Sequence, residues 1–332
     1  MQVACFSTKS YDQEFLSEAL EGSTHDFRFL KPELNHDTVV LADEAEAVCA
    51  FVNDNLDRPV LEALKVAGIR SVVLRCAGFN NIDLQAAKDF GIRVARVPKY
   101  SPYAVAEHTI ALVLTLNRRI HKAYNRVRDS NFSLEGLIGF DLHGRSFGII
   151  GTGEIGKVLA SIVAGFGCRV LLYDIHPDES LTSIGEYVGL DELLRQSDIV
   201  SLQCPLNEHT HHLINRSALE SMKPGAMLVN TSRGGLVDAT AAIACLKSRH
   251  LGGLALDVYE EESGLFFNDL SAQVIQDDVL TRLITFPNVL ITSHQAFFTT
   301  DAMKTIAATT VQNLDQLAAG GEVLNEVKLD NK

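Results

Sequence analysis

The chain has 332 residues and a formal net charge of −13, with 46% hydrophobic and 21% charged residues and no tryptophan. A chain of this length exceeds the size at which one hydrophobic core keeps growing, so it predicts two domains. The negative charge disfavours nucleic-acid and anionic-membrane binding, because both depend on clustered cations. No apolar run is long enough to span a membrane and residues 1–6 lack a basic leader, so we expect a cytoplasmic protein with no nucleic-acid or membrane partner.

The first hundred residues predict an α/β unit of their own, because short apolar runs alternate there with helical patterns. The predicted strands are residues 3–6, 47–52, 71–76 and 92–97, and the predicted helices include residues 59–67 and 84–90. A long helical pattern then runs from Ser101 to about Arg128, and Pro98 and Pro102 mark its start. The basic residues from Arg118 to Arg128 predict a solvated or subunit-facing surface of this helix.

A glycine-rich turn is the strongest motif, and it reads Gly151-Thr152-Gly153-Glu154-Ile155-Gly156. An apolar run precedes it and a helical pattern follows it, which is the setting of the dinucleotide-binding fingerprint. In that fingerprint Gly151 allows the tight turn, Gly153 lets the backbone approach a pyrophosphate, and Gly156 permits close packing of helix and strand. The helix N-terminus favours the anion. An ordinary glycine-rich turn remains the alternative.

The cofactor is predicted to be NAD. A second apolar run, residues 169–173, ends in Asp174, whose carboxylate can accept hydrogen bonds from both hydroxyls of an adenosine ribose. The same charge would repel a 2′-phosphate, and no lysine or arginine stands in residues 175–177. We therefore expect NAD rather than NADP.

The alternation of strand and helix continues after the fingerprint and predicts a doubly wound parallel sheet. The predicted strands are residues 198–203, 226–231, 253–258 and 289–292, the helices are residues 191–195, 216–222 and 239–247, and a last helix spans residues 301–317. Ligands of such sheets bind beyond the carboxyl ends of the strands. Three of these ends are followed by Arg233, Glu262 and His294.

These three side chains form the set that reduction of a 2-keto acid requires. Arg233 offers a planar fork for a carboxylate and a developing oxyanion. His294 can exchange a proton near neutral pH, and a nearby carboxylate such as Glu262 favours its protonated form. Taken singly, Arg233 could close a turn, Glu262 could be a solvated charge, and His294 could be an ordinary strand-end histidine.

Motifs along the chain resemble the D-isomer-specific 2-hydroxyacid dehydrogenase family, and the resemblance extends nearly end to end. Its main segments are residues 151–156, Asn230-Thr231-Ser232-Arg233-Gly234, Asp257-Val258-Tyr259-Glu260 and Ser293-His294-Gln295-Ala296-Phe297. Residues 75–81, 97–102, 131–136 and 264–267 look most like the fermentative D-lactate dehydrogenases of that family. The resemblance implies reversible, NADH-dependent reduction of pyruvate to D-lactate.

The resemblance also implies a role for each site residue. Arg233 would bind and polarise the substrate, Glu262 would tune the acid, and His294 would be the proton donor in reduction and the acceptor in oxidation. The NAD site would comprise Gly151, Gly153, Glu154, Ile155, Gly156, Asp174, Cys204, Pro205, Thr210, Thr231, Ser232 and Asp257. The substrate site would comprise Gly78, Phe79, Tyr100, Arg233, His294 and Phe297.

The implied architecture is discontinuous and has two Rossmann-like or flavodoxin-like domains with doubly wound parallel sheets. Residues 1–100 with 298–332 would form the substrate, or catalytic, domain, and residues 101–297 would form the NAD domain. Closure of the two domains would exclude water and align the nicotinamide with the keto carbon. Family members usually associate through the NAD domain, so a homodimer or homotetramer is expected.

Two local features depart from the family pattern. The segment His209-Thr210-His211-His212 carries extra histidines, but no cysteine or glutamate stands nearby at a zinc-like spacing, so no metal is expected. The acidic run Glu260-Glu261-Glu262 leaves open which carboxylate faces His294, and the family register selects Glu262.

Other activities remain as alternatives. One is a D-2-hydroxyacid dehydrogenase that acts on a bulkier 2-keto acid, and another is a non-catalytic protein that senses NAD(H) on the same scaffold. Phosphoglycerate oxidation is disfavoured because the pocket segments offer no extra phosphate clamp. Formate oxidation is disfavoured because that branch has no comparable acid-tuning glutamate.

Overall fold

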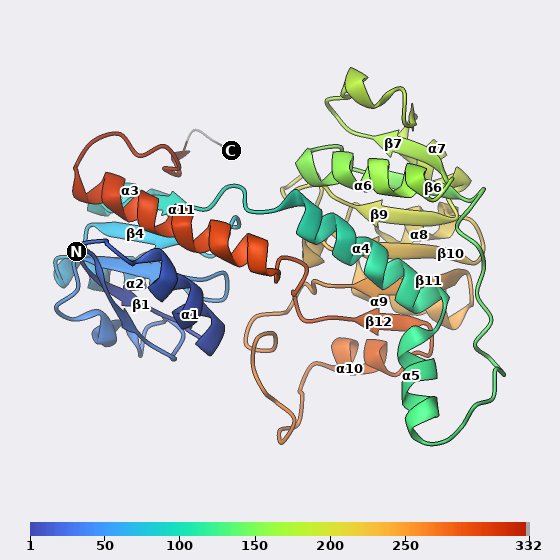
Figure 1. Cartoon of the computed structure of the whole chain (residues 1–332), viewed down its shortest axis with the longest axis horizontal. Helices are drawn as coiled ribbons and strands as arrows, with labels where there is room; N and C mark the ends of the chain where they lie inside the picture. Colours follow the sequence, from blue (N-terminus) through green and yellow to red (C-terminus); the bar gives the residue numbers. More distant parts are fainter. Residues whose placement is uncertain (330–332) are drawn as a thin grey trace. The chain divides into compact units, whose positions relative to one another are not determined.

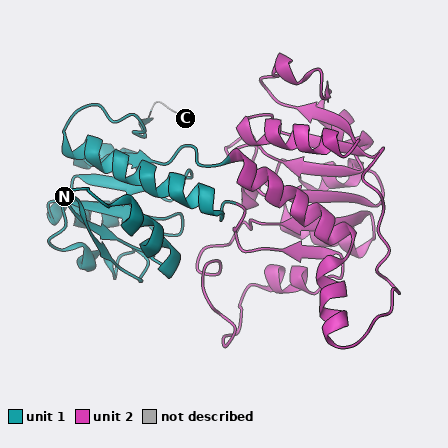
Figure 2. Ribbon diagram, in the orientation of Figure 1, with its two compact units in different colours: residues 1–101, 297–332 teal, residues 102–296 magenta. Residues whose placement is uncertain are grey.

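A computed structural model describes residues 1–329, which divide into two compact units (Figures 1 and 2). Unit 1 comprises Met1–Ser101 and the segment that begins at Phe297, and unit 2 comprises Pro102–Ala296. The chain passes from unit 1 to unit 2 after Ser101 and returns after Ala296, and each point lies one residue from the boundary expected from sequence. No helix in residues 1–329 combines the length and the apolar character that crossing a membrane requires.

Unit 1 is built on a five-stranded parallel sheet in the order β2-β1-β3-β4-β5, the flavodoxin-like order. Its strands are β1 (Gln2–Cys5), β2 (Asp26–Phe29), β3 (Ala47–Ala50), β4 (Ser71–Leu74) and β5 (Arg93–Arg96). Its helices are α1 (Ser10–Ala19), α2 (Arg58–Val66), α3 (Leu84–Phe90), α11 (Thr300–Ala318) and the short η1 (Val39–Ala42). The sequence pattern does not predict β2, an edge strand in which only Phe27 is buried.

The second chain segment completes unit 1. Helix α11 packs on α1 and contributes Ala307, Leu314 and Leu317 to the core that β1, β3, β4 and β5 share. The Asn313 side chain donates to the Arg96 carbonyl at 2.8 Å, so the helix is also fixed to the end of β5. Unit 1 is therefore a discontinuous α/β unit.

Unit 2 is a seven-stranded parallel sheet in the order β12-β11-β10-β9-β6-β7-β8. Its strands are β6 (Ser146–Ile150), β7 (Arg169–Tyr173), β8 (Glu186–Tyr187), β9 (Ile199–Leu202), β10 (Ala226–Asn230), β11 (Leu251–Leu256) and β12 (Val289–Ile291). The chain turns from β6 toward β7 on one side and later toward β9 on the other, so the topological switch point lies between β6 and β9. That is the crevice in which doubly wound sheets bind ligands.

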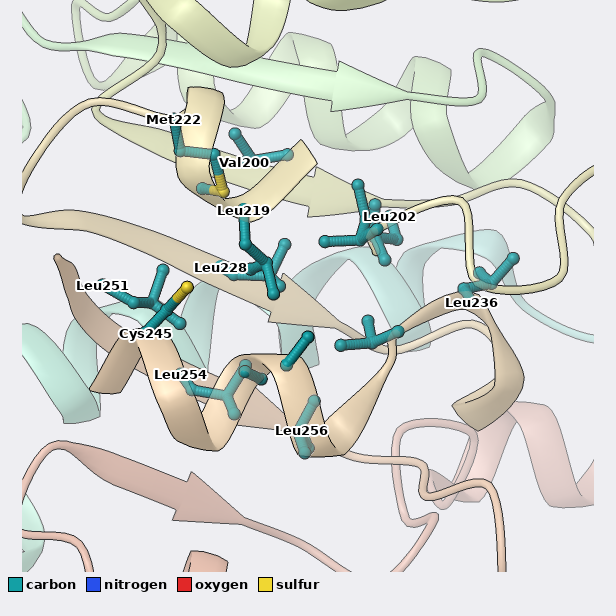
Figure 3. Packing of buried hydrophobic residues seen from close by; sticks show 14 of the residues in the cluster. Val200, Leu202, Leu219, Met222, Leu228, Leu236, Cys245, Leu251, Leu254 and Leu256 are labelled. Carbon is teal, nitrogen blue, oxygen red and sulfur yellow. The ribbon is translucent and has the colours of Figure 1, made fainter. Parts of the chain in front are cut away.

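Helices cover both faces of this sheet (Figure 1). Helices α4 (Pro102–Asn117) and α6 (Glu154–Gly165) pack on one face. The other face carries α7 (Leu190–Gln196), α8 (Arg216–Ser221), α9 (Ala239–Lys247) and α10 (Asp278–Ile284). Figure 3 shows the leucine-rich core on this second face, where Leu228, Leu254 and Leu256 of the strands meet Leu219 and Cys245 of the helices. Strands that are apolar on both faces require such two-sided cover.

The prediction of one long helix from Ser101 to about Arg128 is wrong. The structure has two helices there, α4 and α5 (Ile120–Arg128). Arg119 between them has a φ of 53°, in the left-handed region. The Asn117 side chain donates to the Phe140 carbonyl at 2.7 Å and accepts from the Phe140 N–H at 3.0 Å, so a distant segment holds the end of α4. Helix α5 has no buried residue, which agrees with the exposed surface predicted for its basic side chains.

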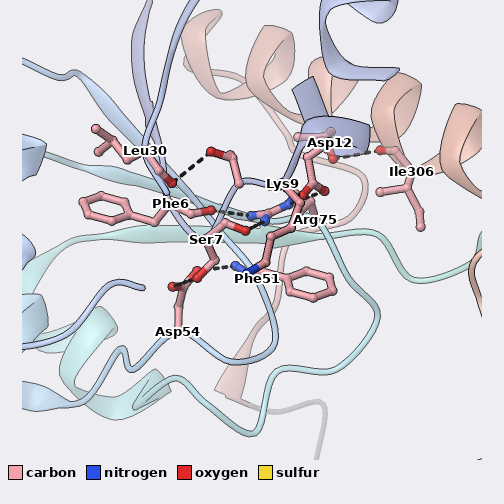
Figure 4. Close-up of polar contacts among 11 residues, drawn as sticks. Phe6, Ser7, Lys9, Asp12, Leu30, Phe51, Asp54, Arg75 and Ile306 are labelled. Carbon is pink, nitrogen blue, oxygen red and sulfur yellow. Dashed lines mark hydrogen bonds and ion pairs between the residues drawn. The ribbon is translucent and has the colours of Figure 1, made fainter. Parts of the chain in front are cut away.

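A buried arginine joins three strand ends of unit 1 (Figure 4). Arg75 follows β4 and is 2% exposed. Its guanidinium donates to the Phe6 carbonyl at 3.0 Å, the Ser7 carbonyl at 2.9 Å and an Asp12 carboxylate oxygen at 3.2 Å. It also lies over the Phe51 ring, 4.7 Å from the centroid. The ends of β1, β3 and β4 are thereby fixed next to the segment that carries Gly78 and Phe79.

A buried carboxylate, that of Asp54, bonds to Ser7, which also bonds to Arg75. Asp54 is 1% exposed, and its oxygens accept from the Ser7 hydroxyl at 2.6 Å and from the N–H groups of Leu34 and Phe51 at 2.7 and 2.6 Å. Buried polar groups are tolerated when their hydrogen bonds are made. Loss of one member would therefore leave several groups unpaired at once.

We predict that Arg75→Met destabilises unit 1 by about 3–5 kcal/mol, since it leaves the Asp12 carboxylate and two carbonyls buried without their donor. The urea midpoint of the transition in which unit 1 unfolds, followed by circular dichroism, measures the effect. Arg70→Met is the matched control, because Arg70 is exposed and its replacement should change stability by no more than about 0.5 kcal/mol. Equal midpoints for the two variants would refute the role of Arg75.

Candidate active site

Polar side chains of unit 2 gather at the carboxyl edge of its sheet. All neighbouring strands of this sheet are parallel, so their carboxyl ends meet at one edge. Along it, β12, β11 and β10 are neighbours and are followed by His294, by Glu262 and by Arg233. Gly151 follows β6 and Asp174 follows β7, on the far side of the switch point.

Two of the three glycines in the turn after β6 leave no space for a side chain. Gly151 has a φ of 98°, and a Cβ there would lie 2.6 Å from the Gln203 backbone. A Cβ on Gly156 would lie 2.1 Å from the Gly151 carbonyl oxygen, so the first turn of α6 sits directly on the loop. Gly153 has open space around it and caps α6 without a side chain, so Glu154 and Ile155 present their N–H groups at an accessible helix N-terminus. These residues fit a dinucleotide.

Asp174 lies directly beside this turn. Its carboxylate accepts from the Thr152 N–H at 2.6 Å, from the Thr152 hydroxyl at 3.1 Å and from the His176 N–H at 2.9 Å. Burial acts to raise the pKa of Asp174, but these hydrogen bonds outweigh burial and hold the pKa below its ordinary value. The group is therefore a half-buried, ionised acceptor beside the glycine turn, as binding of ribose hydroxyls would require.

His294 and Glu262 form a close pair. The two groups approach to 2.9 Å between Nδ1 of His294 and Oε1 of Glu262, and the side chains are only 17% and 23% exposed. The other Glu262 oxygen accepts from the Tyr259 N–H at 3.1 Å, which fixes the carboxylate. The Phe267 ring lies 5.8 Å from the imidazole. A shielded carboxylate of this kind orients the imidazole.

The backbone of His294 is held in an unusual conformation. Its φ is 55°, in the left-handed region that few non-glycine residues adopt. Its N–H donates to the Asp257 carbonyl at 2.6 Å. The Asp257 carboxylate accepts from the N–H groups of Gln295 at 2.9 Å and Ala296 at 2.8 Å. Backbone strain of this kind persists where surrounding contacts fix it, and it is common at functional sites.

Asp257 is wholly buried. Besides the two backbone donors, its carboxylate accepts from the Thr292 hydroxyl at 2.5 Å and lies 3.3 Å from Nε2 of His108. Burial acts to raise the pKa of Asp257, but bonds from His108, Thr292 and the Ala296 N–H outweigh burial and hold the pKa below its ordinary value. In this structure Asp257 positions the His294 turn, and its contact with a nicotinamide stays a prediction.

Arg233 stands on a tightly packed turn. Asn230 at the end of β10 accepts from the Ser232 N–H at 3.0 Å and donates to the Arg233 carbonyl at 2.8 Å. A Cβ on Gly234 would lie 2.0 Å from the Tyr259 carbonyl carbon, so this turn presses on the segment that follows β11. Among residues 1–329, no carboxylate lies within ion-pair distance of the Arg233 guanidinium. The half-buried cation is thus available to an anionic substrate.

The remaining predicted NAD residues form the loop after β9 and the end of β10. The Ser232 hydroxyl donates to the Cys204 carbonyl at 2.6 Å, and burial raises the pKa of the Cys204 thiol to about 11, so the thiol is neutral. The Thr210 hydroxyl donates to the Pro205 carbonyl at 2.7 Å and thereby closes the loop. Thr231 is buried under this edge.

Sequence reasoning missed three polar residues at this edge. The hydroxyls of Thr109 and Thr231 are 2.8 Å apart, and the Gln203 amide donates to Thr231 at 3.1 Å. The Gln203 Oε1 is buried with no hydrogen-bond partner among the described residues. His108 contacts Asp257 as described above. Thr109 and His108 lie on α4, far along the chain from the strand ends, so no local pattern marks them.

The predicted substrate residues Gly78, Phe79, Tyr100 and Phe297 all belong to unit 1. The Arg96 guanidinium lies 4.8 Å from the centroid of the Phe79 ring, and the rings of Tyr100 and Phe297 are 6.3 Å apart at their centroids. These contacts order the side chains within unit 1. Their contact with a substrate stays a prediction.

Two carboxylates of the acidic run, those of Glu260 and Glu262, have different partners. Glu262 faces His294, whereas Glu260 lies 3.0 Å from Nε2 of His211 and 2.9 Å from Nε2 of His212. Burial acts to raise the pKa of Glu260, but the bonds from the two histidines outweigh it and hold the pKa below its ordinary value. The fold therefore brings a glutamate to the histidine-rich loop, where sequence spacing indicated none.

Comparison with known proteins identifies the family to which the chain belongs. The family model for the D-isomer specific 2-hydroxyacid dehydrogenase NAD binding domain matches residues 110–296. The chain is 54% identical to 2-hydroxyacid dehydrogenase A of Aspergillus oryzae, over 95% of this chain and 92% of that protein. It is 51% identical to D-lactate dehydrogenase of Escherichia coli, over 98% of this chain and 100% of that protein.

Solved structures agree with these relatives. A structure described as the pyruvate reductase of Chlamydomonas reinhardtii superposes with a TM-score of 0.93 at 43% identity and covers 98% of both chains. The parallel α/β architecture of the chain is therefore shared with that protein. The chain belongs to the D-isomer-specific 2-hydroxyacid dehydrogenase family and is an NAD-dependent oxidoreductase.

Proposed function

We propose that the protein catalyses the reversible, NADH-dependent reduction of pyruvate to D-lactate. The observation that carries the proposal is the 2.9 Å pair of His294 and Glu262 on the same sheet edge as Arg233, whose guanidinium has no carboxylate partner in residues 1–329. A 2-keto acid needs a cation, a proton donor and a group that orients the donor, and this edge offers all three. Full-length similarity to a protein named D-lactate dehydrogenase supports the choice of acid.

Each side chain has one task in the proposed reaction. Bound NADH supplies the hydride to the keto carbon. Arg233 binds the substrate carboxylate through its planar fork and stabilises negative charge that develops on the carbonyl oxygen. Glu262 engages Nδ1 of His294, which assigns proton donation to Nε2. In the forward direction pyruvate, NADH and one proton are converted to D-lactate and NAD⁺. In the reverse direction the proton returns to His294.

A steady-state comparison of 2-keto acids tests the proposal directly. We expect the highest kcat/KM for NADH oxidation with pyruvate, lower values with 2-ketobutyrate and a branched-chain 2-keto acid, and D-lactate as the product in chiral analysis. A preference for the branched acid would instead identify a dehydrogenase of bulkier acids. NADH binding without turnover of any short 2-keto acid would favour the NAD(H)-sensing alternative.

We predict that His294→Asn lowers kcat for pyruvate reduction by roughly 10²–10⁴-fold, since it removes the proton donor. NADH affinity, measured by fluorescence titration, should stay close to that of the unchanged protein. Glu262→Gln keeps the shape of the partner but removes its charge, so we expect a smaller loss of kcat. Unimpaired turnover in His294→Asn would show that another group donates the proton.

Asp174→Ala should reduce the preference for NADH over NADPH by roughly 10-fold or more, because it removes charge-assisted bonds to the ribose and a charge that repels a 2′-phosphate. The ratio of kcat/KM for the two cofactors is the measurement. Glu179→Ala is the matched control, since Glu179 is an exposed acidic residue in the same connection after β7. An equal ratio in both variants would refute the ribose assignment.

A further inference from the structure

Two histidines and one glutamate converge on the surface of unit 2. Nε2 of His211 lies 3.0 Å from Oε1 of Glu260, and Nε2 of His212 lies 3.2 and 2.9 Å from its two oxygens. One ligand atom from each of the three residues can be chosen so that all lie within 4.8 Å of one another. The imidazole rings are stacked with centroids 4.0 Å apart, and both Nε2 atoms approach the same carboxylate.

The backbone on the histidine side of this cluster is fixed. His212 has a φ of 49°, and its N–H donates to the Gly235 carbonyl at 2.8 Å. Two residues on, the Ile214 N–H donates to the Leu236 carbonyl at 3.0 Å, so the loop is attached to the turn that follows Arg233. These bonds hold the loop in the conformation that brings the two rings together. Binding of an ion there needs little free energy to order the loop.

The glutamate side is equally constrained. A Cβ on Gly234 would lie 2.2 Å from the Glu260 N atom, so only a glycine turn allows Glu260 to stand where it does. The Glu260 carboxylate bonds to His211 and His212, whereas the His294 pair uses Glu262. The cluster is thus separate from the proton-donating pair, although both glutamates belong to one short segment.

Two imidazole nitrogens and one carboxylate are a donor set that Zn²⁺ prefers, with water in a fourth position. Tetrahedral bonds of about 2.0–2.2 Å place neighbouring ligand atoms roughly 3.3 Å apart. The present separations of 2.9–3.2 Å between the glutamate oxygens and the two Nε2 atoms need to open by only a few tenths of an ångström. The side chains of His211, His212 and Glu260 are 52%, 36% and 32% exposed, which leaves room for an entering ion and its water.

We propose that His211, His212 and Glu260 bind one Zn²⁺ ion per chain. The bound ion ties the loop after β9 to the segment after β11, in place of the histidine–glutamate hydrogen bonds. Three protein ligands and an exposed fourth position make this a reversible surface site rather than one that the fold needs. The proposal does not depend on which 2-keto acid the protein reduces.

Calorimetric titration of the untagged, chelator-treated full chain with ZnCl₂ tests the proposal. We expect one ion per chain. His211→Ala and Glu260→Gln should each bind Zn²⁺ at least about 10-fold more weakly, because even the loss of a residue that only hydrogen-bonds to a metal ligand lowers metal affinity by that factor. Zn²⁺ should also raise the melting temperature of the unchanged protein more than that of either variant.

His209→Ala is the matched control, because His209 is an exposed histidine of the same loop that makes no contact with Glu260. It should bind Zn²⁺ as the unchanged protein does. No binding to the unchanged protein overturns the proposal. Binding that persists in Glu260→Gln but is lost in His294→Asn also overturns it, because that result places the ion on the proton-donating pair.

Discussion

One buried carboxylate holds together the part of unit 2 in which the proposed proton transfer takes place. Asp257 ends the buried run of β11 and accepts from the Thr292 hydroxyl and from two N–H groups of the turn that carries His294. A charge without water is tolerated only when such donors surround it. Because its donors come from the segment after β12 and from α4, the position of His294 depends on strand pairing, helix packing and this one charge together.

The sheet edge could be predicted from sequence, because strict alternation of strand and helix requires parallel strands with their carboxyl ends together. Arg233, Glu262 and His294 were expected after successive strands, and the structure shows β10, β11 and β12 to be neighbours. The break between α4 and α5 could not be predicted. It depends on bonds between Asn117 and Phe140, which no local periodicity reports.

The acidic run shows why side-chain roles are harder to predict than strands. The run contains three identical residues, Glu260, Glu261 and Glu262. Their different surroundings arise only from the fold of the segment after β11. The N–H groups of Leu265 and Phe266 both donate to the Glu262 carbonyl, which turns the chain sharply at that residue. Glu262 bonds to His294 and Glu260 bonds to the histidine loop, so two carboxylates only two residues apart have different surroundings.

The discontinuity of unit 1 has a consequence for synthesis of the chain on the ribosome. The strands of unit 1 emerge first, but α11 supplies Ala307, Leu314 and Leu317 to their core, and Glu326 pairs with Arg93 on β5. All of unit 2 is made before these residues appear. Unit 2 can therefore fold while one face of the first sheet still exposes apolar side chains, a state in which chains are prone to aggregate. The last helix within residues 1–329 packs on α1, the first helix to be made.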